Sequence, residues 1–330
     1  MNKDSKSIIE ISNLVKVFKQ KHKGTGVKGS LKSLFRPKYK EFVAVDNISF
    51  SLNKGEIVGF IGPNGAGKST TIKMLTGILF PTSGSMKVLG MVPWDKRKKL
   101  AYEIGSVFGQ KPQLWYHLPA IETFNLFSKI YELDDKKYKT RLNYLVDKFE
   151  LRELLDIPVR KLSLGQRMRC EIVAALLHEP KVLFLDEPTI GLDVVAKQKI
   201  RELIIEMNKK EKVTILLTSH DMQDIEHLCD RIIVINHGKV IYDGDIKKMQ
   251  KDYLQTKIIS VKFGSEFNSI KHIGVKTISH NKYSAEFELS TKDVSIQKFI
   301  SYLMEKYNIL DLTIKESPIE EVITKIYMEK

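Results

Sequence analysis

The amino-acid sequence predicts an α/β fold built around a mostly parallel sheet, and two observations support this prediction. Short apolar runs, typical of buried strands, alternate with helical patterns between residues 182 and 235. Strands that are apolar along their whole length are typical of parallel sheets covered by helices on both faces. A glycine-rich turn also joins the apolar strand Glu56–Ile61 to a helix that we expect to start at Gly67. Repeated strand–turn–helix units of this kind build a parallel α/β sheet.

The remaining elements follow from local patterns along the chain. Three segments are expected to be strands of an antiparallel β part beside the parallel core: Ile8–Phe18, Val43–Leu52 and the end of Thr82–Leu89. Residues 111–178 are expected to form a helical subdomain with a break near Pro158. The alternating region then contains strands at 182–185, 213–218 and 232–235, helices at 194–210 and 221–229, and a hairpin turn at 237–238 that leads into strand 239–242.

A length of 330 residues favours two domains. Residues 1–244 contain all the motifs described below. Beyond them, the pattern predicts strands at 258–263 and 284–289 and amphipathic helices at 295–307 and 317–328. We therefore expect residues 245–330 to form a small α+β appendage that serves dimerisation or regulation. The two cysteines, Cys170 and Cys229, have no partner at zinc-binding spacing and are expected to be buried thiols.

The net charge of +14 is partly concentrated in a basic segment. Residues 19–41 are predicted to be a long loop or insertion, and residues 19–40 hold eight Lys or Arg and no acid. This segment either contacts anionic lipid head groups or is a solvated loop. No apolar run approaches the roughly 18–20 residues that cross a bilayer, and the N-terminus lacks the pattern of a secretory signal. We therefore expect the protein to stay in the cytosol, so that if it works at a membrane another chain must span that membrane.

The segment GFIGPNGAGKSTT, residues 59–71, follows an apolar strand and matches a phosphate-binding loop at Gly62, Gly67, Lys68 and Ser69. Glycines let successive backbone N–H groups turn inward, and the helix N-terminus adds a partial positive charge. Lys68 is expected to reach the β- and γ-phosphates, and Ser69 to bind Mg²⁺. The loop therefore predicts a site for Mg²⁺ and ATP, with the nucleotide bound by Asn64, Gly65, Ala66, Gly67, Lys68, Ser69 and Thr70.

Acidic residues follow a second buried strand. In KVLFLDEPT, residues 181–189, we expect Asp186 to hold Mg²⁺ and Glu187 to act as general base toward the attacking water. His220 ends the buried strand VTILLTSH and is expected to reach the γ-phosphate at the same edge of the sheet. Gln110, in VFGQKPQLW, is a candidate ligand of Mg²⁺ and a sensor of the attacking water.

A further motif, LSLGQ at residues 162–166, completes a family resemblance. Together with GPNGAGKST, Gln110, LFLDEPT and the GLD at residues 191–193, it resembles the ATP-binding subunit of ABC transporters over residues 8–244. The resemblance implies a P-loop NTPase core and two copies that meet head to tail. It also implies that Ser163, Gly165 and Gln166 touch the γ-phosphate bound by the opposite copy, and that Asp193 lies across the dimer interface.

Two positions depart from the family pattern. The common signature is LSGGQ, and Leu164 replaces its first glycine. The family also stacks adenine on an aromatic residue of the first strand region. Phe18 matches best by position, and Tyr39 and Phe42 are alternatives at the far end of the insertion.

Four segments resemble a bacterial exporter subgroup that includes daunorubicin-type and viologen-exporter-like ATPases: FGQKPQLWYHLP, LSLGQRMRC, LDEPTIGLDV and the C-terminal SPIEEVITKIY. This resemblance implies a peripheral ATPase at the cytoplasmic face of the cell membrane. The resemblance implies a separate membrane-spanning permease, docked around residues 111–160 with Trp115, Tyr116 and Leu118 as exposed apolar candidates. The alternative is a soluble ABC ATPase that acts on nucleic acid or ribosomes, which the positive charge favours mildly. A single phosphate loop and the lack of sustained heptads argue against it, so no specific nucleic acid is expected.

Overall fold

The computed structural model describes residues 7–22, 38–109, 112–253, 256–316 and 319–328. The chain divides into two compact units, Met1–Asp243 and Gly244–Lys330. Each unit has a sheet and a core of its own, and the two are described separately.

The first unit is built on a six-stranded sheet in the order β5-β6-β7-β3-β8-β9. Neighbouring strands from β5 to β8 pair in parallel, which confirms the predicted fold class. Parallel strands place their carboxyl ends at one edge, so the segments that follow β3, β6 and β7 meet there. The strands are β3 (Ile57–Ile61), β5 (Ile104–Phe108), β6 (Val182–Asp186), β7 (Thr214–Thr218), β8 (Arg231–Asn236) and β9 (Lys239–Asp245).

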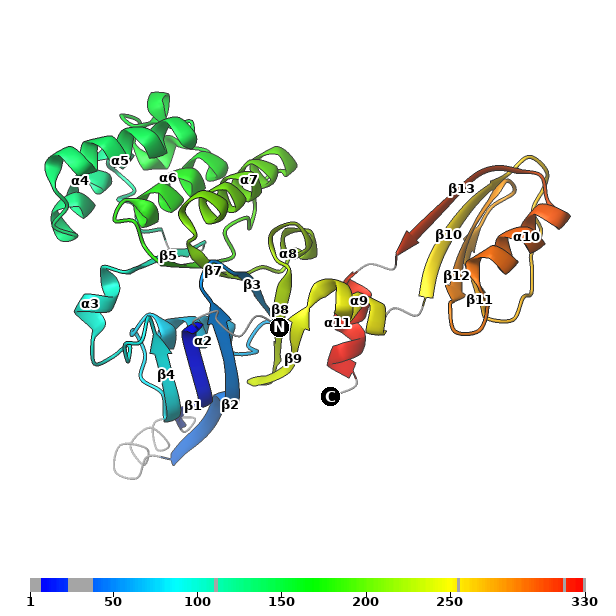
Figure 1. Cartoon of the computed structure of the whole chain (residues 1–330), viewed down its shortest axis with the longest axis horizontal. Helices are drawn as coiled ribbons and strands as arrows, with labels where there is room; N and C mark the ends of the chain where they lie inside the picture. Colours follow the sequence, from blue (N-terminus) through cyan, green and yellow to red (C-terminus); the bar gives the residue numbers. More distant parts are fainter. Residues whose placement is uncertain (1–6, 23–37, 110–111, 254–255, 317–318, 329–330) are drawn as a thin grey trace, which may run out of the picture. The chain divides into compact units, whose positions relative to one another are not determined.

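Helices flank this sheet and form the predicted helical subdomain. Figure 1 shows α4, α5 and α6 gathered at one end of the unit, with α7 beside them. Helix α6 packs against β5, and α8 packs against β3. The chain breaks near Pro158 as predicted, because Pro158 directly precedes a short 3₁₀ turn. The helices are α2 (Lys68–Leu75), α3 (Arg97–Ala101), α4 (Ala120–Ile130), α5 (Asp135–Lys148), α6 (Leu164–Leu176), α7 (Val194–Glu211) and α8 (Met222–Leu228), with 3₁₀ turns η1 (Arg152–Leu154) and η2 (Val159–Lys161).

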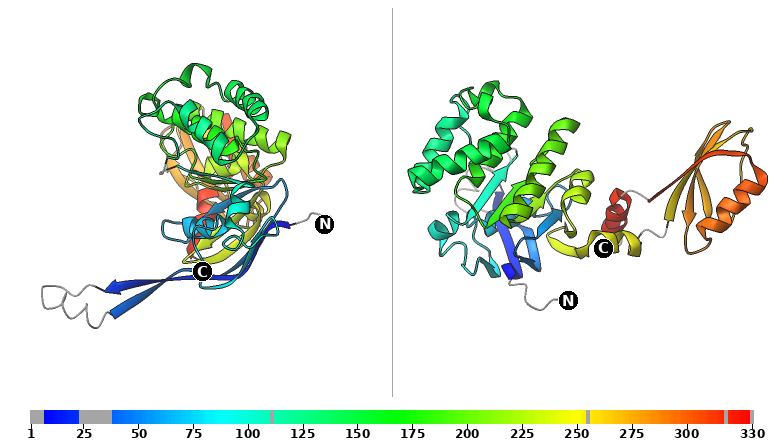
Figure 2. Two further views of the ribbon diagram at one scale, coloured as in Figure 1. Left: turned by 90° about the vertical axis from the view of Figure 1, so that its left-hand side faces the viewer. Right: turned by 45° about the horizontal axis from the view of Figure 1, so that its top comes forward.

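A three-stranded antiparallel sheet, β2-β1-β4, forms the other part of the unit. Its strands β1 (Ser7–His22) and β2 (Lys38–Asn53) are longer than the sequence predicted, whereas β4 (Ser83–Val88) lies within the predicted turn and strand at residues 82–89. The expectation of a loop over all of residues 19–41 was wrong at both ends. The ladder continues from Lys19 opposite Glu41 to His22 opposite Lys38, so these basic residues form two hairpin arms that extend from the body in Figure 2. Residues 23–37 lie outside the described part of the chain.

The second unit contains a four-stranded antiparallel sheet in the order β11-β12-β10-β13. Phe299 and Leu303 of α10 pack on the apolar face of this sheet. Strands β11 and β13 and helix α9 were not predicted. Helices α9 and α11 pack against each other. The elements are α9 (Ile246–Tyr253), β10 (Thr256–Phe263), β11 (Val275–His280), β12 (Ser284–Ser290), α10 (Ile296–Lys306), β13 (Ile309–Glu316) and α11 (Ile319–Met328).

Candidate nucleotide-binding site

The loop between β3 and α2 has backbone geometry that only glycine accommodates at two positions. Gly67 precedes α2 with φ of 110°, and a Cβ atom there would lie 2.5 Å from the carbonyl oxygen of Ala44. A Cβ atom on Gly62 would lie 2.2 Å from the carbonyl oxygen of Ile235. The loop therefore curls tightly around the N-terminus of α2, where backbone N–H groups and the helix dipole favour an anion.

Lys68 is held inside this loop. Its side chain is buried, and its Nζ donates to the carbonyl oxygen of Gly62 at 2.6 Å and to that of Pro63 at 3.2 Å. Burial lowers the pKa of Lys68, and the carboxylates of Glu187 and Asp186 oppose this shift. An anionic ligand would compensate the desolvated ammonium, as a phosphate does in this type of loop.

Asp186 lies at the end of β6 and connects the loop to β7. Its Oδ2 accepts a hydrogen bond from Ser69 Oγ at 3.2 Å, and its Oδ1 accepts one from Thr218 Oγ1 at 2.6 Å. Thr218 stands opposite Asp186 in the ladder between β6 and β7. The hydroxyl of Ser69 and the carboxylate of Asp186 are oxygen donors of the kind that Mg²⁺ prefers, so these two predicted ligands fit the ion chemically.

Glu187 has an unusual backbone and a specific partner. Its φ is 57°, in the left-handed region that side chains other than glycine rarely adopt. Its backbone N–H donates to the carbonyl oxygen of Thr218 at 3.1 Å, and its Oε1 lies 2.8 Å from His220 Nε2. Its Oε2 is buried and has no hydrogen-bond partner among the described residues. A buried acceptor oxygen of this kind suits a group that takes a proton from a bound water.

A cavity of about 390 Å³ opens over the phosphate loop and the acidic edge. Phe18 and Phe42 are directly opposite in the β1–β2 ladder, so both reach this cavity from the same face of the hairpin. Tyr39 is exposed and is not among the described residues of the wall. The wall consists of Phe18, Phe42, Ala44, Asn64, Gly65, Ala66, Gly67, Lys68, Ser69, Thr70, Lys73, Phe108, Asp186 and Glu187.

The signature segment begins α6 and is well ordered by hydrogen bonds. Ser163 and Gln166 form a reciprocal capping box, in which Ser163 Oγ accepts from the Gln166 N–H at 3.2 Å and Gln166 Oε1 accepts from the Ser163 N–H at 2.8 Å. A Cβ atom on Gly165 would lie 2.9 Å from Ala196 Cβ of α7. Asp193 caps α7 by accepting from the Ala196 N–H at 2.9 Å. Among the described residues, none of the signature positions 163, 165 and 166 lines the cavity.

Gln110 lies outside the described residues, and its neighbour Gly109 donates its N–H to the carbonyl oxygen of Asp186 at 2.8 Å. Sequence reasoning missed Thr218, which bonds Asp186. The sequence does contain a signal for this residue, because Thr218 ends a buried strand that runs parallel to β6. It also missed the buried carboxylate of Asp224, for which the sequence offers no signal, because an acidic residue in a short helix is usually solvated.

This chain is similar to a family profile and to many known proteins, two of which are described here. The profile of the ABC transporter family matches residues 45–190. The ABC transporter ATP-binding protein NatA of Bacillus subtilis is 35% identical over 65% of this chain and 87% of its own length. The linearmycin resistance ATP-binding protein LnrL of the same organism is 32% identical over 87% of this chain and 94% of its own.

A solved structure agrees with these relatives. CbiO1 from Clostridium perfringens, described as part of the ABC transporter complex cbiONQ, has a TM-score of 0.62 and 28% identity over 74% of this chain and 91% of its own. No helix among the described residues is long and apolar enough to span a membrane. These relatives do not favour the alternative of an ATPase that acts on nucleic acid. The chain belongs to the ABC transporter family, as an ATP-binding subunit with ATPase activity.

Proposed function

We propose that two copies of this chain close head to tail on ATP and that the closure drives export of a substrate through a separate permease. The separation of the signature segment from the cavity carries this proposal. Ser163, Gly165 and Gln166 form the N-terminus of a capped helix, which favours an anion, yet they do not line the cavity of their own chain among its described residues. A second copy in the opposite orientation would supply the γ-phosphate that this helix terminus lacks.

Within one site, each side chain has a role that its position supports. Lys68 and the glycine-rich loop would bind the phosphates, and Phe18 or Phe42 would stack on the adenine. Ser69 and Asp186 would hold Mg²⁺, with Gln110 proposed as a further ligand although it lies outside the described residues. Once bound, Mg²⁺ would neutralise charge on the phosphate oxygens.

Glu187 would accept a proton from water as the water oxygen attacks the γ-phosphorus and the bond to the leaving ADP breaks. His220, 2.8 Å from Glu187 Oε1, would orient that carboxylate and contact the γ-phosphate. Hydrolysis removes the group that the two copies share, so the dimer would open and reset.

The permease would dock beside the segment that follows Gln110. Trp115, Tyr116 and Leu118 are 49%, 52% and 39% exposed, which is unusual for large apolar side chains close to one another. We propose that this patch receives the permease at the cytoplasmic face of the membrane. Export is proposed because LnrL is named for resistance to linearmycin, and the finer assignment to the daunorubicin-type or viologen-exporter-like subgroup rests on the resembling segments.

The Glu187→Gln variant tests the proposal. The amide cannot accept the proton from water, so ATP should stay bound and the two copies should remain associated. We expect ATP hydrolysis to fall by about 10²–10⁴-fold and a dimer to appear on size exclusion with ATP but not with ADP. Glu202→Gln, which changes an exposed carboxylate of α7, is the matched control and should stay monomeric and active. A Glu187→Gln protein that hydrolyses ATP at the normal rate would rule out this role.

The basic segment at residues 19–40 is proposed to contact anionic lipid head groups. Flotation with vesicles that contain a phosphatidylserine fraction tests this contact. Reversing the charges of Lys28, Lys32 and Arg36 should reduce vesicle binding, since each basic residue near such a surface contributes about 1 kcal/mol. Unchanged binding would favour the solvated-loop alternative.

A further inference from the structure

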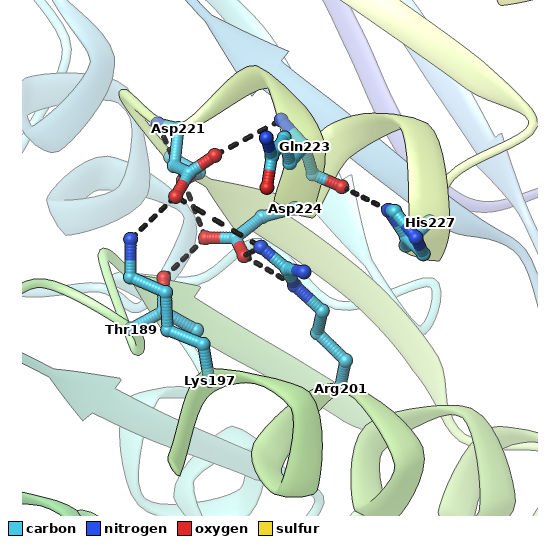
Figure 3. A network of polar contacts seen from close by, with 8 residues as sticks. Thr189, Lys197, Arg201, Asp221, Gln223, Asp224 and His227 are labelled. Carbon is cyan, nitrogen blue, oxygen red and sulfur yellow. Dashed lines mark hydrogen bonds and ion pairs between the residues drawn. The ribbon is translucent and has the colours of Figure 1, made fainter. Parts of the chain in front are cut away.

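A network of polar contacts joins Thr189 and α7 to the start of α8, and Thr189, Arg201 and Asp224 within it are buried (Figure 3). We propose that its central carboxylate, Asp224, is a positioning residue for ATP hydrolysis, which fixes Glu187 and His220 relative to each other through Thr189 and Ser219. This inference rests on the proposed function, because it assigns a role within the same site.

Asp224 receives hydrogen bonds from two separate segments of the chain. Its Oδ2 accepts from Thr189 Oγ1 and, at 2.9 Å, from Ser219 Oγ. Thr189 follows β6 and Ser219 follows β7. A single carboxylate oxygen therefore joins the two turns that leave neighbouring strands of the sheet.

The other oxygen of Asp224 is held by α7. Oδ1 accepts from Arg201 Nε at 2.6 Å, and Arg201 Nη2 lies 2.5 Å from the same oxygen. Asp224 is 1% exposed and Arg201 is 7% exposed, so both charges are removed from water and each depends on the other. Lys197 of α7 bonds Asp221 in the same network. The carboxylate of Asp224 thus has little freedom to rotate.

The two joined turns carry the groups proposed for catalysis. Glu187 is two residues before Thr189, and His220 directly follows Ser219. The contact between Glu187 Oε1 and His220 Nε2, at 2.8 Å, spans the same two turns as the bonds to Asp224. Glu187 also has the left-handed φ of 57°, which persists only where surrounding contacts fix the backbone. The hydrogen bond of Thr189 to Asp224 is a contact of this kind.

A purely structural role would have a different signature from a positioning role. A structural hydrogen bond affects how much of the protein is folded, and leaves kcat of the folded fraction unchanged. A positioning bond affects the orientation of Glu187, and a displacement of about 1 Å at a catalytic group can cost about 100-fold in rate. The kinetic constants of folded protein therefore separate the two roles.

The test compares Thr189→Val with two other variants in the full-length chain. Valine keeps the shape of threonine and removes the hydroxyl, whereas Thr189→Ser retains it. Thr214→Val is the matched control, because Thr214 is also fully buried and accepts a hydrogen bond from the Gly55 N–H at 2.8 Å. Thr214 begins β7, at the end of the strand away from the site. We would measure kcat and KM for ATP hydrolysis together with Tm for each protein.

We expect Thr189→Val to lower kcat by about 10–100-fold with KM for ATP within about twofold of the unaltered chain. Thr189→Ser should restore most of the rate, and Thr214→Val should lower Tm to a similar extent with normal kcat. In a Glu187→Gln background, Thr189→Val should have no further effect on the residual rate, because it acts through that carboxylate.

Equal kcat in Thr189→Val and Thr214→Val would overturn the proposal. So would an additive loss in the Glu187→Gln background. If Thr189→Val melts far below Thr214→Val, Ser219→Ala offers the same comparison, since it removes the other donor to Asp224 Oδ2. ATP hydrolysis by the unaltered chain tests the proposed function independently, and only the ratios between variants test the role of Asp224.

Discussion

The two aromatic walls of the cavity differ in their surroundings, which predicts unequal roles in nucleotide binding. Phe18 and Phe42 are direct partners in an antiparallel ladder, so their Cβ atoms are about 4.5–5.5 Å apart and the rings project side by side. A sandwich around adenine would require two rings about 7 Å apart, since each contact takes about 3.5 Å. One ring should therefore stack on the base while the other flanks it.

Phe18 is the better candidate for the stacking ring. It is half-buried, and Lys16 Nζ lies 5.0 Å from its ring centroid, whereas Phe42 is 50% exposed. A ring that is already fixed by neighbours loses less conformational entropy when it binds a ligand. Stacking on a base is worth about 1–3 kcal/mol, which corresponds to about 5–150-fold in Kd. We expect Phe18→Ala to weaken ATP binding by this factor, and Phe42→Ala to weaken it by less than about fivefold.

Calorimetric titration with ATP in the Glu187→Gln background measures this without hydrolysis. Tripolyphosphate provides an internal control, because it engages the phosphate loop and has no base, so its Kd should not change in Phe18→Ala. Tyr39→Ala, which alters an exposed residue outside the described wall of the cavity, should bind ATP normally. A larger loss in Phe42→Ala than in Phe18→Ala, or an equal loss for tripolyphosphate, would refute the reasoning.

Three further predictions follow from the geometry of the site. Gly67→Ala should abolish ATP binding in calorimetry and lower Tm, because its Cβ would lie 2.5 Å from the Ala44 carbonyl oxygen at a φ of 110°. Ser163→Ala should cost about 1 kcal/mol in urea unfolding through loss of the helix cap, and should prevent the ATP-dependent dimer of the Glu187→Gln protein. Burial raises the pKa of the Glu171 carboxyl, although hydrogen bonds from the backbone N–H groups of Gln113 and Leu114 act in the opposite direction. The contribution of Glu171 to the free energy of unfolding is therefore full below the unfolded-state pKa, and it is lost as pH rises through the folded-state pKa. The stability of Glu171→Gln relative to the unaltered chain, measured by urea unfolding, should therefore increase as pH rises above the ordinary glutamate pKa of about 4.5, and no change in this difference would contradict the shift.

The parts of the site that sequence predicts well are those that depend on local backbone chemistry. Gly62 and Gly67 are recognisable because no other residue fits their backbone, and Asp186 is recognisable because it ends an apolar strand. Parallel pairing then brings Asp186 and Thr218 to the same edge without further information. These features need only the order of strand, turn and helix, which the sequence shows directly.

Other features depend on tertiary contacts that a single sequence does not show. The arms of β1 and β2 beyond residue 18 contain basic residues that pattern analysis assigns to a loop, yet the ladder continues to His22. Strand β11 is mostly exposed and lacks the apolar alternation of a half-buried strand. Asp224 is buried among partners from other segments, of which Arg201 of α7 carries the opposite charge. In each case the structure of the residue or strand depends on a contact with a segment that is distant in the sequence.

The leucine in the signature segment brings the N-terminus of α6 close to the loop that follows Glu187. Leu164 replaces a common glycine and has an ordinary helical backbone, since it begins α6 and is not among the described residues with positive φ. Its side chain approaches the GLD loop, because a Cβ atom on Gly191 would lie 3.0 Å from Leu164 Cδ2. Gly165 packs equally closely on Ala196.

The signature helix therefore rests on the segment between Glu187 and the start of α7. A shift of Glu187 when the γ-phosphate leaves would pass through that short segment to the N-terminus of α6, which is proposed to contact the nucleotide of the other copy. The same segment is anchored from behind by the bond of Thr189 to Asp224. Loss of that bond would leave the segment less fixed relative to both Glu187 and the signature helix. In a mixed dimer with one Thr189→Val subunit, we accordingly expect slower hydrolysis in both sites, and a defect confined to the altered subunit's own Glu187 would argue against this route.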